Sequence, residues 1–203
     1  MRLSFVISEH PGGLRPDRME QYEWTAQRLA ALACADVETV QYTEVDSFTA
    51  DAVVLSGSYD PWYLHEPEAL ERLREVVRAY DGPVLGICAG MQLQVEAGGG
   101  SVATADRPTE AGFGTVDVVG DHDLFRGLSP QISVFEHHTD EVVSLPEGFE
   151  VVARSAACAV EAIGAREGRW WGTQFHPERW SPEHPAGRTI MQNFLELSGI
   201  PLR

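Results

Sequence analysis

The sequence contains no lysine, and all 15 of its basic residues are arginine. Such a chain cannot use a lysine Schiff base, a phosphate-loop lysine or a lysine general base. The 15 arginines stand against 31 acidic residues, which gives a formal net charge of −16. Because so acidic a chain has little with which to neutralise a phosphate backbone, we expect no nucleic-acid partner.

Long apolar runs and paired cysteines are also scarce. No stretch approaches the roughly 20 apolar residues that a membrane-spanning helix needs, and only a short apolar run, residues 3–7, lies near the N-terminus. We therefore expect a cytoplasmic protein with no membrane partner. The three cysteines, Cys34, Cys88 and Cys158, are widely spaced and odd in number, which favours reduced thiols over a disulfide framework. We expect Cys34 and Cys158 to be small core residues.

Strand patterns and helix patterns alternate along the chain. The predicted strands cover residues 3–8, 37–41, 52–55, 83–87 and 170–175, and the predicted helices cover residues 18–33, 66–80, 89–97 and 187–197. Several further β-rich runs lie between residues 112 and 165. This order predicts an α/β fold with an open, mostly parallel twisted sheet, helices on both faces and a small β-rich extension. With 43% hydrophobic content, 203 residues are enough for one core, so we expect a single domain, 1–203.

Cys88 lies in a pattern that is typical of an enzymatic nucleophile. The apolar run 83–87 ends in Gly86-x-Cys88-x-Gly90 and passes directly into a helix pattern. A sharp turn from strand to helix crowds its neighbours, so glycine is needed on both sides of the nucleophile. The N-terminus of the helix also favours a thiolate. We therefore predict a catalytic thiol, in preference to an inert buried cysteine.

A second cluster supplies a candidate base for this thiol. His176 follows the apolar run 170–175, and Pro177 prevents the strand from continuing. A histidine in this position could take the proton of a thiol and later protonate a departing amine. Glu178 could hold the imidazole in the required tautomer. We predict that Cys88, His176 and Glu178 form a catalytic triad.

Taken together, these motifs resemble those of the class I glutamine amidotransferases over nearly the whole chain. The resemblance rests on the segments 53–58, 86–92 (Gly-x-Cys-x-Gly-x-Gln), 137–142 and 172–178 (ending Gln-Phe-His-Pro-Glu). Within the family, the segments 145–151 and 153–155 are most similar to the amidotransferase part of GMP synthase. The resemblance implies a flavodoxin-like amidotransferase fold and a glutaminase with a cysteine nucleophile.

The family pattern also suggests how an oxyanion would be bound. The turn at Cys88 offers the backbone N–H of Ala89, and the loop after the third predicted strand offers one more, for which Gly57 and Ser58 are the candidates. Family members usually carry glycine where Ser58 stands, so this loop must tolerate a side chain. On composition alone, residues 56–58 could also be a simple turn.

Five further residues are expected, by resemblance, to bind the substrate: Gln92, His137, His138, Thr139 and Asp140. His137 and Thr139 depart from the family pattern, and they could narrow the pocket or favour a bulkier γ-glutamyl compound. Two adjacent histidines can indicate a metal, but no third ligand stands at a plausible sequence spacing. We therefore expect neither a metal nor a cofactor.

The expected reaction is hydrolysis of the side-chain amide of L-glutamine, or of a related γ-glutamyl compound, through a γ-glutamyl thioester. The chain has no nucleotide-binding glycine loop, so the ammonia would serve a separate ATP-dependent synthetase subunit, GMP-synthase-like or with another acceptor. One alternative is a free-standing γ-glutamyl amide or peptide hydrolase, with the loops 10–17 and 59–63 lining a wider pocket. Another is a non-catalytic regulatory subunit, against which the intact triad argues.

Overall fold

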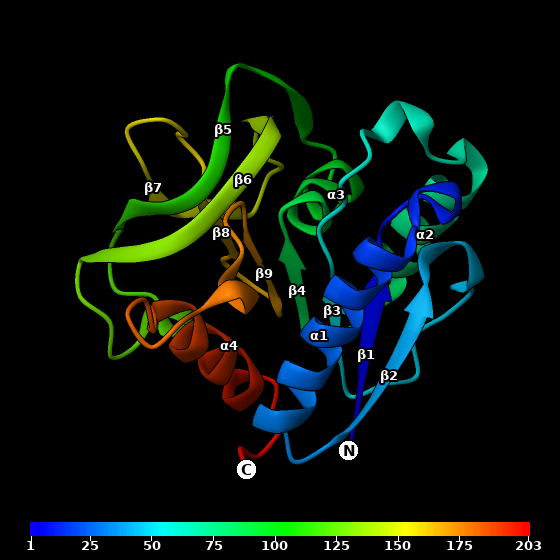
Figure 1. Cartoon of the computed structure of the whole chain (residues 1–203), viewed down its shortest axis with the longest axis horizontal. Coiled ribbons are helices and arrows are strands. Elements are labelled where there is room, and N and C mark those ends of the chain that lie inside the picture. The colour runs from blue at the N-terminus through cyan, green and yellow to red at the C-terminus, as the bar shows by residue number, and fades with distance from the viewer.

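The computed structural model describes residues 1–203 as one nine-stranded sheet with helices on both faces (Figure 1). The strands are β1 Arg2–Ile7, β2 Asp36–Gln41, β3 Ala52–Leu55, β4 Val84–Ile87, β5 Ser101–Val118, β6 Gln131–Ser144, β7 Phe149–Arg154, β8 Ala162–Ala165 and β9 Trp170–Thr173. The α-helices are α1 Pro16–Leu32, α2 Pro67–Ala79, α3 Ala89–Ala97 and α4 Ala186–Leu197. The strand order is β2-β1-β3-β4-β9-β8-β7-β5-β6.

One half of the sheet, β2-β1-β3-β4-β9, is parallel throughout. The strands β1, β3 and β4 are covered on both faces, which explains why they read as continuous apolar runs, whereas the edge strand β2 has no buried residue. Phe5 and Ile7 on β1 belong to the core that includes α1 and α4. Val6 belongs to the core that includes α2 and α3 on the opposite face. The predicted α/β fold with helices on both sides is confirmed.

The other half of the sheet, from β9 through β8, β7, β5 and β6, is antiparallel. The β-rich extension predicted for the middle of the chain is therefore a continuation of the main sheet through the β8–β9 pair. β5 and β6 form a long curled hairpin (Figure 1) whose register shifts near Thr104 and Thr109, and Phe135 on β6 pairs with His176 beyond the end of β9. This curl brings β6 to the ends of the parallel strands.

Two predictions need correction. The predicted strand 170–175 ends at Thr173, because the next backbone N–H, that of Gln174, donates to Glu161 outside the named strands. Cys34 is exposed, so its assignment to the core was wrong, whereas Cys158 is buried as expected. Cys34 lies just beyond the end of α1, where its backbone N–H donates to the carbonyl of Pro201. None of the helices combines the length and the apolar character needed to cross a membrane.

Candidate active site

Cys88 occupies a strained turn between β4 and α3. Its φ is 52° and its ψ is −110°, and it is the one non-glycine residue of the chain with positive φ. Such a conformation costs on the order of 1–3 kcal/mol and persists only where its surroundings enforce it. A Cβ on Gly90 would lie 2.4 Å from the carbonyl oxygen of Leu55, and one on Gly86 would lie 2.5 Å from the backbone of Gly90. The requirement for glycine on both sides of Cys88 is confirmed.

His176 and Glu178 lie at the end of β9, where residues Pro177–Arg179 form a short 3-10 helix. The backbone N–H of His176 donates to the carbonyl of Phe135 on β6 at 2.7 Å. Nδ1 of the imidazole lies 2.8 Å from Oε1 of Glu178. Burial alone would lower the pKa of His176, but the Glu178 carboxylate and the Cys88 thiol outweigh it and raise that pKa to about 10. Two contacts therefore position His176: the backbone hydrogen bond to Phe135 and the contact of its ring with Glu178.

The ends of β3, β4 and β9 bring Gly57, Cys88 and His176 together. A Cβ added to Gly57 would lie 3.0 Å from Cε1 of His176 and 3.4 Å from Cβ of Cys88. The side-chain amide of Gln174 donates to the Cys88 sulfur at 3.5 Å, and the thiol faces the carbonyl of His137 at 3.9 Å. This meeting point is the carboxyl edge of the parallel strands, where open α/β sheets place their sites.

The loop after β3 presents unused backbone donors beside the thiol. The N–H groups of Gly57 and Ser58 donate to no group of the protein, and the N–H of Ala89, at the first position of α3, has no intrahelical acceptor. Ser58 has no positive φ, so a side chain is tolerated where the family usually carries glycine. Its hydroxyl lies 2.9 Å from the carbonyl of Asp60. The loop therefore keeps its donors despite the substitution.

Glu9, just after β1, holds the loop that follows β3 through hydrogen bonds to its backbone. Its side chain is fully buried and accepts from the backbone N–H groups of Tyr59 at 2.7 Å and Asp60 at 3.0 Å. The hydroxyl of Tyr22 donates to it at 3.1 Å, and Nη1 of Arg18 lies 3.6 Å away. Sequence reasoning missed Glu9. The available signal was an acidic residue directly after an apolar strand of a parallel sheet.

A cavity of about 450 Å³ opens over these groups. All of the sequence-predicted site residues line it: Cys88, His176, Glu178, Gly57, Ser58, Ala89, Gln92, His137, His138, Thr139 and Asp140. Gln92 is not a solvent-facing helix residue, because its amide donates to the carbonyl of Asp140 at 2.9 Å and accepts from the Trp62 indole at 3.1 Å. On β6, His137 and Thr139 are exposed whereas His138 is 95% buried, as strand alternation requires.

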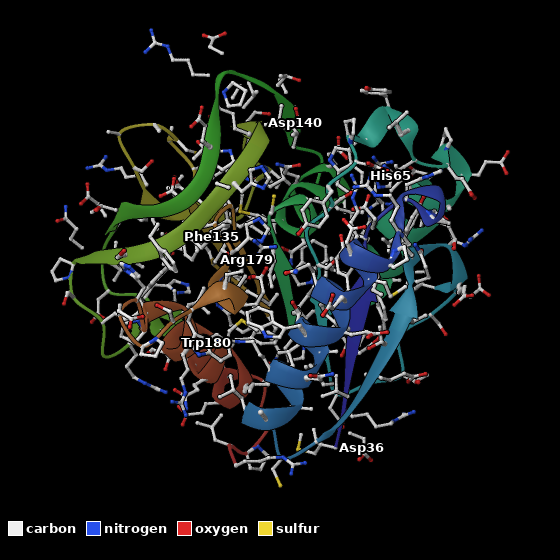
Figure 2. The ribbon with its side chains drawn as sticks, viewed as in Figure 1. Asp36, His65, Phe135, Asp140, Arg179 and Trp180 are labelled. Carbon is white, nitrogen blue, oxygen red and sulfur yellow. The ribbon has the colours of Figure 1, made fainter.

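Two features of the cavity wall differ from expectation. The aromatic loop 59–63 lines the cavity, but no residue of the loop 10–17 does. Arg179, which the sequence reasoning did not single out, is the one basic residue other than histidine in the wall. Its guanidinium donates to the hydroxyl of Tyr59 at 2.7 Å and lies 4.8 Å from the ring centre of Phe135. Figure 2 shows Arg179 beside Phe135, with Asp140 further along β6.

Comparison with known proteins agrees with this geometry. The family model described as glutamine amidotransferase class-I matches residues 16–197. The chain is a class I glutamine amidotransferase. This amidotransferase is 41% identical to the glutamine-hydrolyzing GMP synthase subunit of Methanobrevibacter smithii over 159 residues, which are 78% of this chain and 79% of that protein. It is 39% identical to the corresponding subunit of Haloquadratum walsbyi over 186 residues, 88% of this chain and 94% of the other.

A solved structure gives the same result for the fold. A crystal structure from Thermoplasma acidophilum, of a protein provisionally assigned as the same GMP synthase subunit, superimposes with a TM-score of 0.78 at 30% identity. The match covers 97% of the amidotransferase and 94% of that chain. The resemblance to class I amidotransferases, and within them to GMP synthase subunits, is confirmed.

Proposed function

We propose that this amidotransferase hydrolyses the side-chain amide of L-glutamine through a thioester on Cys88, and that it supplies the ammonia to a separate synthetase subunit. One observation carries the proposal. The Cys88 thiol, the His176 imidazole held by Glu178 at 2.8 Å, and the unused N–H groups of Gly57 and Ser58 meet at one end of the cavity.

The first half-reaction would form the thioester. His176 accepts the thiol proton, and the sulfur attacks the amide carbon. The raised pKa of His176 keeps that proton on the ring while the tetrahedral intermediate forms. The negative charge on the former carbonyl oxygen is stabilised by the backbone N–H groups of Ala89 and the 57–58 loop.

Collapse of the tetrahedral intermediate breaks the C–N bond and completes the thioester, and hydrolysis of the thioester is the second half-reaction. The imidazolium of His176 protonates the departing nitrogen, which leaves as ammonia, and the neutral imidazole then takes a proton from water. The resulting hydroxide attacks the thioester, the C–S bond breaks to release glutamate, and the Cys88 thiolate takes back the proton held by His176. Glu178 keeps the ring oriented through both steps.

The cavity wall supports an amino-acid substrate. The Arg179 guanidinium is suited to the α-carboxylate of glutamine, because a fork of N–H donors matches a carboxylate. Asp140 lies in the same wall and is a candidate partner for the α-amino group. We infer that the two residues select a free amino acid with its γ-amide directed at Cys88.

The identity of the acceptor is proposed from the relatives. The relatives from Methanobrevibacter smithii and Haloquadratum walsbyi are both glutamine-hydrolysing subunits of GMP synthase. This chain has no lysine and no phosphate-loop pattern with which to bind ATP. We propose that the synthetase partner is a separate ATP-dependent subunit of the GMP-synthase type, which would aminate xanthosine monophosphate.

Glutamate and ammonia release from L-glutamine by the full chain, alone and with a GMP synthase synthetase subunit, tests this function. The Cys88→Ala variant should lose at least about 1000-fold in turnover, whereas the exposed Cys34→Ala serves as the matched control and should retain full turnover. Cys88→Ala turnover equal to that of the parent would contradict the proposal. Absence of turnover both alone and with the partner would favour a non-catalytic regulatory subunit.

A free-standing γ-glutamyl hydrolase is the second candidate, favoured by the size of the cavity. About 450 Å³ falls within the range of sites for drug-sized ligands, roughly 300–1,000 Å³, and the aromatic loop 59–63 forms part of the wall. A panel of γ-glutamyl amines in the same assay separates the two functions. Faster cleavage of those amines than of glutamine, without any partner, would select the hydrolase.

A further inference from the structure

Three potential metal ligands meet at β6, next to the catalytic cavity that His138 also lines. They are His138 on β6, and Cys158 and Glu161 in the connection between β7 and β8. The exposed fractions of these residues are 5%, 1% and 0%, and their ligand atoms all lie within 4.8 Å of one another. The fold thus brings together an imidazole, a thiol and a carboxylate from two distant segments.

Two of these three buried residues lack the partners that buried polar groups normally have, whereas the Cys158 thiol donates to the carbonyl of Val160 at 3.4 Å. Neither ring nitrogen of His138 and neither carboxylate oxygen of Glu161 makes a hydrogen bond. The Ser155 hydroxyl lies near Glu161 and the backbone of Asp140 lies near His138, but neither pair meets hydrogen-bond geometry. The Ser155 hydroxyl accepts from the backbone N–H groups of Ala157 and Cys158. An unsatisfied buried polar group costs about 1–3 kcal/mol, and a charged one costs more. Two such residues in one cluster therefore offer unpartnered nitrogen and oxygen atoms that a cation could bind.

No cation of the chain balances the charge of this cluster. Glu161 and the neighbouring buried Glu136 take part in none of the ion pairs of the structure. Burial, and then Glu136, raises the pKa of Glu161 to about 8. Burial, and then Glu161, raises the pKa of Cys158 to about 12, whereas burial and the nearby His176 lower the pKa of His138 to about 4. Without a cation, the cluster is thus held neutral by protons.

We propose that His138, Cys158 and Glu161 form a binding site for a divalent cation of the zinc class. Neutral imidazole nitrogen, cysteine sulfur and carboxylate oxygen are the ligands that zinc takes. Ligand atoms around tetrahedral zinc lie about 3.5 Å apart, so the side chains need to close by about 1 Å. Binding releases the protons of Cys158 and Glu161. With three protein ligands, the fourth position is left to a water molecule.

Such a site would support the wall of the catalytic cavity. On β6, the carbonyl of Phe135 accepts from the backbone N–H of His176 at 2.7 Å. The carbonyl of His137, on the same strand, lies 3.9 Å from the Cys88 sulfur. A cation bound by His138 would tie this strand to the connection between β7 and β8. The site goes beyond the proposed glutaminase, whose reaction does not require it.

Cobalt titration of the full chain tests the site directly. The chelator-treated protein is prepared as the Cys88→Ser variant, because Cys88 and His176 could themselves hold a metal. We expect one equivalent of Co²⁺ with the near-ultraviolet thiolate-to-cobalt band that a cysteine ligand produces. In the Cys88→Ser background, a second substitution, Cys158→Ser, should remove the band and weaken zinc binding about 100-fold. Glu161→Gln in the same background should weaken zinc binding about 10-fold. Cys34→Ser, the matched control, should leave the thiolate-to-cobalt band and the zinc affinity unchanged.

Two outcomes would overturn the site. One is the absence of a stoichiometric cobalt complex in the Cys88→Ser protein, and the other is a thiolate band that survives Cys158→Ser. Circular dichroism shows whether each variant is folded. If Cys158→Ser does not fold, the near-isosteric Glu161→Gln decides the question, because unchanged zinc affinity in competition with a chromophoric chelator would reject Glu161 as a ligand. These readouts do not depend on glutamine turnover, so their failure is distinguishable from failure of the proposed function.

Discussion

Glu9 and Glu161 are both completely buried, yet their surroundings are opposite. Glu9, at the end of β1, accepts from three backbone N–H groups and a tyrosine hydroxyl and lies 3.6 Å from Arg18. Glu161, just before β8, has no hydrogen bond and no ion pair at either carboxylate oxygen. Glu178 is intermediate, with one oxygen at His176 and the other unpaired.

The difference shows that burial alone does not tell what a carboxylate does. A carboxylate surrounded by donors is a structural anchor, because each donor would lose its partner if the charge were removed. A carboxylate without donors must keep its proton or acquire a cation. The number of donors thus separates the anchor of the oxyanion loop from the proposed metal ligand.

Glu9→Gln should give the largest effect, because the new amide NH₂ would face donors where a carboxylate oxygen now accepts. We expect a loss of about 3 kcal/mol in the free energy of unfolding, measured by urea denaturation. Glutamine turnover should fall about 100-fold as the 57–60 loop loses its anchor. A variant with parental stability and turnover would show that the loop is held by other contacts.

Arg18→Gln removes the cation from the same site and should have the next largest effect. Arg18 is 17% exposed and also pairs with Asp60 at 2.7 Å, so we expect a loss of about 2 kcal/mol. Arg15→Gln is the matched control, because Arg15 and Asp17 form a pair at 3.6 Å with both side chains more than 60% exposed. The control should change the free energy of unfolding by less than about 0.5 kcal/mol. If Arg18→Gln and Arg15→Gln lowered the free energy of unfolding equally, Arg18 would contribute no more than an exposed arginine does.

Glu178→Gln should have a smaller effect that depends on pH. The folded protein raises the pKa of His176 from 6.5 to about 10. The resulting stabilisation is fully present below pH 6.5 and is lost as the pH rises through 10. The parent should therefore exceed the variant by about 1 kcal/mol near pH 6.5, and the gap should close toward pH 10. Thermal unfolding of both proteins across this range checks the sign, and a gap that widens with pH would contradict it.

The parallel half of the fold could be predicted from the sequence because its strands β1, β3 and β4 are apolar runs covered on both faces. The turn at Cys88 was also predictable, since Gly86 and Gly90 each lie two residues from Cys88 and this spacing reflects local sterics. His176 and Glu178 are neighbours in the chain, so their contact also needed no knowledge of the sheet. In both of these cases the residues that contact one another are also close together in the sequence.

The anchor and the buried cluster could not be predicted in the same way. The amides that Glu9 accepts from belong to Tyr59 and Asp60, in a loop that follows a different strand. His138 meets Cys158 and Glu161 only because the antiparallel half curls, and its spacing from them in sequence matches no zinc pattern. Arg179 reaches the cavity because the short helix after β9 turns it toward Tyr59. Each of these contacts depends on strand order rather than on a sequence motif.

Glu161→Gln should change the free energy of unfolding least, and whether the variant is more or less stable than the parent should depend on the presence of zinc. In the presence of EDTA we expect a change within about 0.5 kcal/mol, or a small gain, because no donor loses its partner when the charge is removed. With excess zinc the parent should gain about 2–3 kcal/mol by mass action while the variant gains less. Urea denaturation of both proteins, with EDTA and with zinc, measures the four values. A loss in EDTA as large as that of Glu9→Gln would mean that Glu161 is a satisfied anchor as well, and the contrast between the two buried glutamates would disappear.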